Sequence, residues 1–267
     1  MLCKICNCES KNIFNGKILG KYETKYFHCE KCGFLFAEDP ERWLEHAYKE
    51  SIASMDTGIM LRNNINSRKL SILLYFFLKD KENSECLDYA GGYGIFTRLL
   101  RDVGFNFYWQ DKYTKNLMAN GFEGDLNKKY EVCTCFECFE HLVLPLQEIE
   151  TILKLSDTLI FSTILLPEPI PVQQDWWYYA PQSGQHISFY SEKTLRFIAK
   201  SFGLEYLNIF GFHIFTELRQ SLILKRIDIY IKPSLMQGVS MLYDKIRKKM
   251  QPKTIEDMNM IIRRLLQ

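Results

Sequence analysis

The sequence has no marked excess of charge and no long hydrophobic run, and both absences exclude broad classes of protein. Its 34 Lys and Arg nearly match its 32 Asp and Glu, which leaves a formal net charge of +2 at pH 7. Such a balance does not predict nucleic-acid binding, which usually needs a strongly basic face. No apolar run approaches the roughly 18 residues of a membrane-spanning helix. The segment Met1-Leu2-Cys3-Lys4 starts a cysteine motif instead of an export signal.

What the sequence does contain is a large apolar fraction and nine cysteines. Hydrophobic residues make up 47% and aromatic residues 14%, so the chain can bury a sizeable core. At 267 residues it suits one average domain with additions. We expect a cytoplasmic, reducing location, where cysteines serve as metal ligands or core residues more often than as disulfides. We divide the chain into residues 1–40, 41–225 and 226–267.

The N-terminal part, residues 1–40, is polar and carries two tight cysteine pairs. Each pair has two residues between its cysteines: Cys3 and Cys6, then Cys29 and Cys32. This spacing lets both thiolates of a pair reach one tetrahedral ion, and four thiolates close the shell of a structural zinc. Gly33 directly after the second pair relieves the backbone there. We therefore expect a zinc ribbon. Unrelated cysteines or a redox pair stay open as alternatives, as does Cys8 or His28 as a substitute ligand.

From residue 84 the chain alternates between strand-like and helix-like segments. The expected strands cover residues 86–90, 106–110, 122–125, 131–135 and 158–163, and the expected helices cover residues 95–101, 142–155 and 191–202. Such alternation predicts an α/β fold with a Rossmann-like, doubly wound, mostly parallel sheet.

Further segments flank this alternating region. Helices are expected over residues 41–50 and 57–78, and late strands over residues 204–210 and 213–224. The tail from residue 226 is expected to be basic and helical, and it is a candidate oligomer-forming face.

A glycine-rich turn follows the first of the alternating strands, in Leu87-Asp88-Tyr89-Ala90-Gly91-Gly92-Tyr93-Gly94. Small residues let the backbone turn sharply and approach a ligand closely. A dinucleotide site would have a third glycine where this chain has Thr97, so an NAD-linked enzyme is disfavoured. Asp88 suits a cationic ligand, Asp111 the two hydroxyls of a ribose, and Asp125 an adenine amino group. The alternative for each acid is a loop carboxylate or a helix cap.

The pattern Asp88-x-Ala90-x-Gly92-x-Gly94, followed by Tyr130 to Leu142 with its Glu140-His141-Leu142 ending, resembles the class I S-adenosylmethionine-dependent methyltransferases. The similarity covers roughly residues 60–225. Within the family the sequence is similar to the branch whose fourth strand runs into a Glu-His-Leu segment, which includes many small-molecule and sugar methyltransferases. It implies S-adenosylmethionine as the cofactor, held by a set of residues around the strand ends: Asp88, Ala90, Gly91, Gly92, Gly94, Asp111, Asp125, Phe136 and Glu137. Ala90 stands where the family has its first glycine.

The segment Gly184-Gln185-His186-Ile187-Ser188-Phe189-Tyr190-Ser191 is similar to the His-Glu-His-x-x-Tyr-x-Ser stretch of zinc-containing sugar C-methyltransferases. The last histidine of that stretch is a proposed base, and it matches His186. Gly184 and Gln185 depart from the pattern, and the chain ends without that family's second large C-terminal domain, so the methylated atom stays open. A hydrogen-bonded structural role is the alternative for His186, and His141 is expected to cap or pack.

Residues 164–187 hold four of the eight prolines and four consecutive aromatic residues, so we expect a long loop over a site. We interpret these aromatics as a lid or acceptor wall, with core packing as the alternative: Trp176, Trp177, Tyr178 and Tyr179. The leading hypothesis is a methyltransferase acting on a hydroxyl or activated carbon of a sugar, a nucleotide sugar or a related small metabolite. The alternative is a zinc-ribbon adaptor with a degenerate methyltransferase fold that recruits a protein or nucleic acid.

Overall fold

The computed structural model describes residues 1–49 and 55–266, with the backbone alone at residues 230 and 232–237. The strands are β1 (Lys11–Ile18), β2 (Tyr22–His28), β3 (Leu35–Ala37), β4 (Glu85–Tyr89), β5 (Asn106–Gln110), β6 (Val132–Cys135), β7 (Thr158–Phe161), β8 (Ser188–Phe189), β9 (Glu205–Ile209) and β10 (Phe212–Thr216). The helices are α1 (Glu41–Ala47), α2 (Ile59–Phe77), α3 (Ile95–Val103), α4 (Pro145–Leu153), α5 (Glu192–Ser201), α6 (Leu218–Arg247) and α7 (Thr254–Leu265). Three short 3-10 helices are η1 (Phe139–His141), η2 (Gln173–Asp175) and η3 (Trp177–Tyr179).

The strands form a six-stranded sheet in the order β5-β4-β6-β7-β10-β9 and a four-stranded sheet in the order β1-β2-β3-β8. In the larger sheet β4 pairs in parallel with β5 on one side and with β6 on the other. β9 and β10 form an antiparallel hairpin. The predicted α/β fold with a mostly parallel sheet is therefore confirmed.

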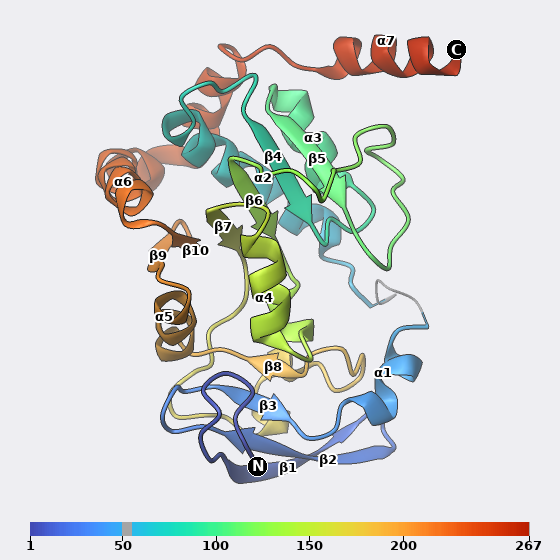
Figure 1. The fold of residues 1–267 in the computed structure, drawn as a ribbon, viewed down its shortest axis with the longest axis vertical. Helices are drawn as coiled ribbons and strands as arrows, with labels where there is room; N and C mark the ends of the chain where they lie inside the picture. The colour runs from blue at the N-terminus through green and yellow to red at the C-terminus, as the bar shows by residue number, and fades with distance from the viewer. Residues whose placement is uncertain (50–54, 267) are drawn as a thin grey trace. The chain divides into compact units, whose positions relative to one another are not determined.

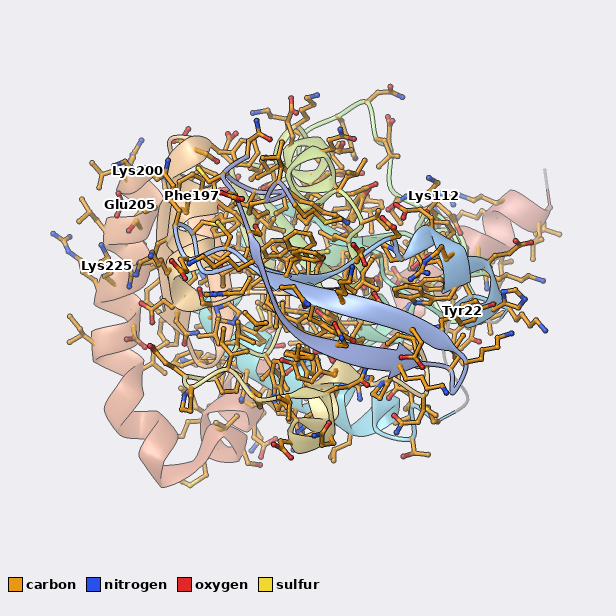
Figure 2. The ribbon with its side chains drawn as sticks, turned by 90° about the horizontal axis from the view of Figure 1, so that it is seen from below. Tyr22, Lys112, Phe197, Lys200, Glu205 and Lys225 are labelled. Atoms are coloured by element: carbon orange, nitrogen blue, oxygen red, sulfur yellow. The ribbon has the colours of Figure 1, made fainter. Side chains whose placement is uncertain are left out.

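The four-stranded sheet begins with a hairpin whose strands alternate inward and outward side chains. In β2, Thr24 and Tyr26 are buried while Glu23 and Lys25 are exposed, as expected for a half-buried strand. Tyr22 at the start of β2 lies beside α1 (Figure 2), where its hydroxyl is 2.9 Å from Nδ1 of His46. β3 then pairs with β8, a strand from much later in the chain (Figure 1).

Some predicted elements differ from the observed ones. The strand expected at 122–125 is reduced to a single bridge between Trp109 and Glu123, because a turn with Gly121 at φ +85° comes directly before it. The late strand ends at Thr216, well before residue 224. The residues after it, from Leu218, form α6 because their buried positions follow the helical spacing: Ser221, Leu224, Ile227 and Ile231.

Several predicted helices are shorter than expected, among them α4 and α1. α4 begins at Pro145, not at residue 142, since proline suits the first helical position. α1 ends at Ala47, and Glu50, the last residue of the predicted 41–50 helix, lies outside the described residues.

Contacts group the chain into two compact units. The first holds residues 1–56, 135–154 and 160–216, and the second holds residues 57–134, 155–159 and 217–267. The division into residues 1–40, 41–225 and 226–267 stays a prediction. Across the described ranges, no helix combines the length and the apolar character that a bilayer crossing needs.

Candidate active site

The glycine-rich turn lies at the carboxyl end of β4, where the neighbours of that strand lie on opposite sides. This is the switch point at which open α/β sheets bind ligands. Ala90, Gly92 and Gly94 have φ angles of 57°, 54° and 82°, so the chain turns through three left-handed residues. A Cβ at Gly91 would lie 2.8 Å from both Asp88 Oδ2 and the Trp109 ring. The sharp turn expected from the sequence is present, and it has no room for a larger side chain at Gly91.

Asp88 lies beneath this turn and is only 2% exposed. Its Oδ1 accepts a hydrogen bond from the Thr134 hydroxyl at 2.9 Å, and its Oδ2 accepts one from the Thr97 hydroxyl at 3.1 Å. Burial raises the pKa of Asp88 to about 7, although the two hydroxyls oppose that shift. The buried side chain of Asp88 thus packs against the turn and stabilises it. Its charge can affect a ligand only across the backbone of the turn.

Asp111, directly after β5, holds the turn from the side. Its Oδ2 accepts a hydrogen bond from the amide of Gly92 at 3.0 Å, and its Oδ1 accepts from the amides of Tyr113 and Thr114 at 2.7 Å each. The indole of Trp109 donates to the Gly92 carbonyl at 2.9 Å. Both backbone polar groups of Gly92 are therefore positioned by residues at the end of β5.

Asp125, by contrast, is exposed and caps its own loop. Its Oδ1 accepts from the backbone amide of Asn127 at 2.9 Å and from that residue's side-chain amide at 3.0 Å. This is the loop-carboxylate arrangement that the sequence left open as the alternative.

Phe136 and Glu137 follow β6 and belong to the first unit. Phe136 stacks on Phe212 with ring centroids 5.2 Å apart. Glu137 has a left-handed φ of 51°, and Ser162 fixes it twice: the Ser162 hydroxyl accepts from the Glu137 amide at 2.9 Å and donates to its carboxylate at 2.8 Å. Residues with strained backbone angles that their surroundings hold in place cluster at functional sites, and Glu137 with its two hydrogen bonds to Ser162 is such a residue.

A histidine cluster forms where η1 meets the loop before β8, also in the first unit. The ligand atoms of Glu140, His141 and His186 lie within 4.8 Å of one another. Nδ1 of His186 is 2.6 Å from the Tyr178 carbonyl, and Nδ1 of His141 is 3.1 Å from the Gln185 carbonyl. The predicted base and the histidine expected to cap or pack thus share one centre.

Glu140 is buried and the two histidines are partly exposed, and removal from water shifts the pKa values of Glu140 and His141. Burial, followed by the charge of Glu137, raises the pKa of Glu140 to about 8. Burial, followed by the proximity of His186, lowers the pKa of His141 to about 3. Both shifts favour the uncharged forms, as expected for groups taken out of water.

The aromatic run does not form the exposed wall that its prolines suggested. Trp176, Tyr178 and Tyr179 are 9%, 2% and 0% exposed and pack in a core with the four-stranded sheet, whereas Trp177 is 74% exposed. The expectation is corrected for these three residues, because the sheet gives them an apolar face to cover. Tyr178 also borders the histidine cluster, with its ring centroid 4.7 Å from that of His186.

The four predicted zinc ligands form one cluster. Sγ of Cys3 is 3.5 Å from Sγ of Cys32, and Sγ of Cys6 is 3.4 Å from Sγ of Cys29. All four sulfur atoms lie within 4.8 Å of one another. Bonds of about 2.3 Å to one tetrahedral ion place sulfur atoms about 3.8 Å apart, so the set fits zinc. Cys8 points elsewhere, with its thiol 3.5 Å from the Cys6 carbonyl oxygen.

Several residues that position these groups were not selected from the sequence. Thr97 was considered only as a missing glycine, and Thr134 and Ser162 stood in ordinary strand segments. A small hydroxyl residue facing an acidic strand end is a usable signal, since a buried carboxylate needs such a donor. Glu140 carried a signal too, because it precedes a histidine in the segment that carried the resemblance.

Comparison with known proteins decides the family. A family model described as a methyltransferase domain matches residues 61–209, more than half of the chain. The chain belongs to the methyltransferase-domain family. The predicted methyltransferase fold and enzymatic activity are confirmed by that match, which spans the turn, Asp111 and the histidine cluster.

Solved structures similar to this methyltransferase have low sequence identity to it. Magnesium protoporphyrin IX methyltransferase from Synechocystis PCC 6803, solved with bound S-adenosylmethionine, is 16% identical over 67% of this chain and 90% of that one, with a TM-score of 0.41. An O-methyltransferase family protein from Burkholderia thailandensis is 12% identical over 67% and 69%, with a TM-score of 0.43. Human N-acetylserotonin methyltransferase is 10% identical over 67% and 66%, with a TM-score of 0.41. No curated protein matches the chain.

Proposed function

We propose that this methyltransferase transfers the methyl group of S-adenosylmethionine to a sugar, a nucleotide sugar or a related small metabolite. The observation that carries the proposal is the bond between Asp111 and the Gly92 amide, which joins an acid at the end of β5 to the turn after β4. That pairing puts a carboxylate beside a backbone that a ligand can approach closely.

The donor would be held by the turn and the acids around it. Ala90, Gly91, Gly92 and Gly94 would lie against the cofactor, and Asp111 would accept hydrogen bonds from its ribose hydroxyls. Asp88 would favour the cationic methionine end through the turn, since its side chain is buried beneath it. Asp125, Phe136 and Glu137 remain proposed cofactor contacts, as the family resemblance implies.

On the acceptor side, His186 would act as the general base. A carbonyl oxygen only accepts hydrogen bonds, so the 2.6 Å contact with Tyr178 assigns the ring hydrogen to Nδ1 and the lone pair to Nε2. In the transfer, the acceptor oxygen or carbon forms a bond to the methyl carbon, the carbon–sulfur bond breaks, and the acceptor proton moves to Nε2. Trp177, as the exposed aromatic of its run, would stack on the acceptor.

The cysteine cluster would hold a structural zinc. Four thiolates close a tetrahedral shell and leave no position for a substrate, so the ion would stabilise the N-terminal strands without taking part in the reaction. A cytoplasmic location fits this proposal, because a reducing compartment keeps the four thiols available.

Ligand binding tests the proposed donor. We expect S-adenosylmethionine and S-adenosylhomocysteine, but not NAD, to raise the melting temperature in a saturable way. Asp111→Asn should weaken that binding by on the order of tenfold or more, because it removes a charged acceptor. Asp157→Asn, an exposed acid paired with Lys129 in the same unit, is the matched control and should bind normally. The absence of any shift with either compound contradicts the proposal.

A further inference from the structure

The histidine cluster has a geometry that the role of a single base does not explain. Glu140 and His141 are consecutive in η1, and His186 comes from the loop before β8. The amide of Ile187 donates to the Glu140 carbonyl at 2.8 Å, so the two segments are fastened together next to the three side chains. Three potential ligands from two segments therefore meet at a fixed point.

The hydrogen bonds of the two imidazoles bear on which nitrogen each ring can offer to a metal ion. Nδ1 of His186 donates to the Tyr178 carbonyl, which leaves the lone pair of this ring on Nε2. Nδ1 of His141 is 3.1 Å from the Gln185 carbonyl and 2.9 Å from the Tyr48 hydroxyl, and in the tautomer that donates to the carbonyl this ring too keeps its lone pair on Nε2. Histidines that bind metals nearly always donate their other ring hydrogen to such a carbonyl.

The carboxylate of Glu140 is the third electron-pair donor. Glu140 is fully buried, and the donors that interact with its carboxylate among the described residues are its own backbone amide and the Tyr178 and Thr163 hydroxyls, none of which has good hydrogen-bond geometry. Such donors offset only part of the cost of burying an acid, and a group of this kind generally has a cation or a further donor beside it. A proton can bridge only two of the three donors, whereas one metal ion can bind all of them.

We propose that Glu140, His141 and His186 bind a divalent transition-metal cation. Two imidazoles and one carboxylate are a ligand set used by catalytic zinc and non-haem iron sites, and three protein ligands leave positions open. Bonds of about 2.0–2.2 Å would require small side-chain rotations from the present spacing. This site differs from the closed four-thiolate cluster in ligand chemistry and in having fewer protein ligands than a metal ion can bind.

The inference deepens the proposed function and rests on it in one respect, the identity of the oxygen ligand. An acceptor hydroxyl bound at an open position would become more acidic and release its proton to water, leaving an alkoxide as the nucleophile. His186 would then serve as a ligand, and its role as a base would apply only to the metal-free protein.

Cobalt(II) titration of the full chain tests the site directly. With zinc first loaded on the cysteines, added cobalt should give the weak d–d absorption of nitrogen and oxygen ligands, without the intense thiolate charge-transfer bands of a cysteine site. One further ion per chain is expected beyond the cysteine-bound ion. If zinc-loaded wild-type protein takes up no cobalt, the proposal is overturned.

Variants assign the bound ion to its ligands. His141→Ala and His186→Ala should each abolish the second cobalt signal. Cys29→Ser should leave that signal in place and, when cobalt is added without prior zinc, should lack the thiolate bands that the wild type then shows. His46→Ala, an exposed histidine that pairs with Tyr22, is the control and should bind as wild type does. Tyr48→Phe should weaken cobalt binding by roughly tenfold, since outer partners of a ligating histidine have effects of that size. A second ion that persists in both cluster variants, with their folding checked by circular dichroism, refutes the assignment.

The donor assay separates this inference from the proposed function. Cobalt binding without any response to S-adenosylhomocysteine would sustain the metal site and refute the methyl donor. Binding of S-adenosylhomocysteine by a protein that takes up no second ion would support the methyl donor and refute the metal site.

Discussion

Replacing Asp88 by Asn should change how the stability of the chain depends on pH. In the folded chain burial raises the pKa of Asp88 to about 7 from an ordinary 3.8. Between those values the folded protein keeps a proton that the unfolded chain has released. Stability therefore falls as the pH rises through this window, and it levels off above pH 7. Asp88→Asn retains the shape of the side chain and removes the titration.

The size of the effect follows from the same two values. At about 1.4 kcal/mol per pH unit, the full difference corresponds to about 4 kcal/mol, and the part between pH 5 and pH 8 to about 2–3 kcal/mol. The residue is buried, so bulk water does not screen this effect, although the protein interior is more polarisable than dry protein and makes the figure an upper bound.

Urea unfolding at several pH values from 5 to 8 measures this prediction. As the pH rises from 5 to 8, the free energy of unfolding of Asp88→Asn minus that of the wild type should increase by about 2 kcal/mol. Asp157→Asn, whose side chain is half exposed, should run parallel to the wild type. If the free energy of unfolding of Asp88→Asn depends on pH in the same way as that of the wild type, burial does not raise the pKa of Asp88 as described.

Three further predictions concern stability. Ala90→Gly should stabilise the chain by up to about 1 kcal/mol in urea unfolding. Relief of left-handed strain of about 1–2 kcal/mol exceeds the cost of the greater unfolded-state entropy of glycine. Ala199→Gly, in the helix α5, is the control and should lower the free energy of unfolding by about 1 kcal/mol. Asp257→Asn should cost about 3 kcal/mol in the same assay, because Arg101, 2.6 Å from Asp257 and buried with it, would lose its counter-charge. Cys29→Ser should release zinc on metal analysis and lower the melting temperature markedly, and a wild-type level of zinc would contradict the four-thiolate site.

Local patterns in the sequence were sufficient to predict the turn and most elements around it. Small residues at Gly92 and Gly94 can take left-handed angles, and the alternation of strands and helices is a periodic signal that needs no tertiary information. The burial of Asp88 could not be predicted in this way, because its partner Thr134 is 46 residues away and reaches it only through the pairing of β4 with β6.

The aromatic run and the histidine centre show the same limit. Prolines around Trp176 predicted a surface loop, yet the apolar face of the four-stranded sheet lies close enough to bury most of that run. His186 was selected from its place just beyond the aromatic loop and through a resemblance, and nothing local to it indicated that Glu140 and His141 share its site. Tertiary contacts across more than 40 residues decide both cases, and single-sequence periodicity has no access to them.

The N-terminal cysteine module is physically joined to the segment that carries His186. β3 follows the second cysteine pair and bonds to β8, and the Ala37 amide donates to the Ile187 carbonyl at 3.0 Å. Gly33, at φ +78°, lies so close to Ser191 that a side chain there would collide with the Ser191 hydroxyl. The residues directly after His186 are therefore held by β3, the strand that follows the cysteine cluster, and by the turn at Gly33. The cysteine cluster at that point helps to keep β8, a strand of two residues that is too short to be stable alone, in a fixed position beside His186.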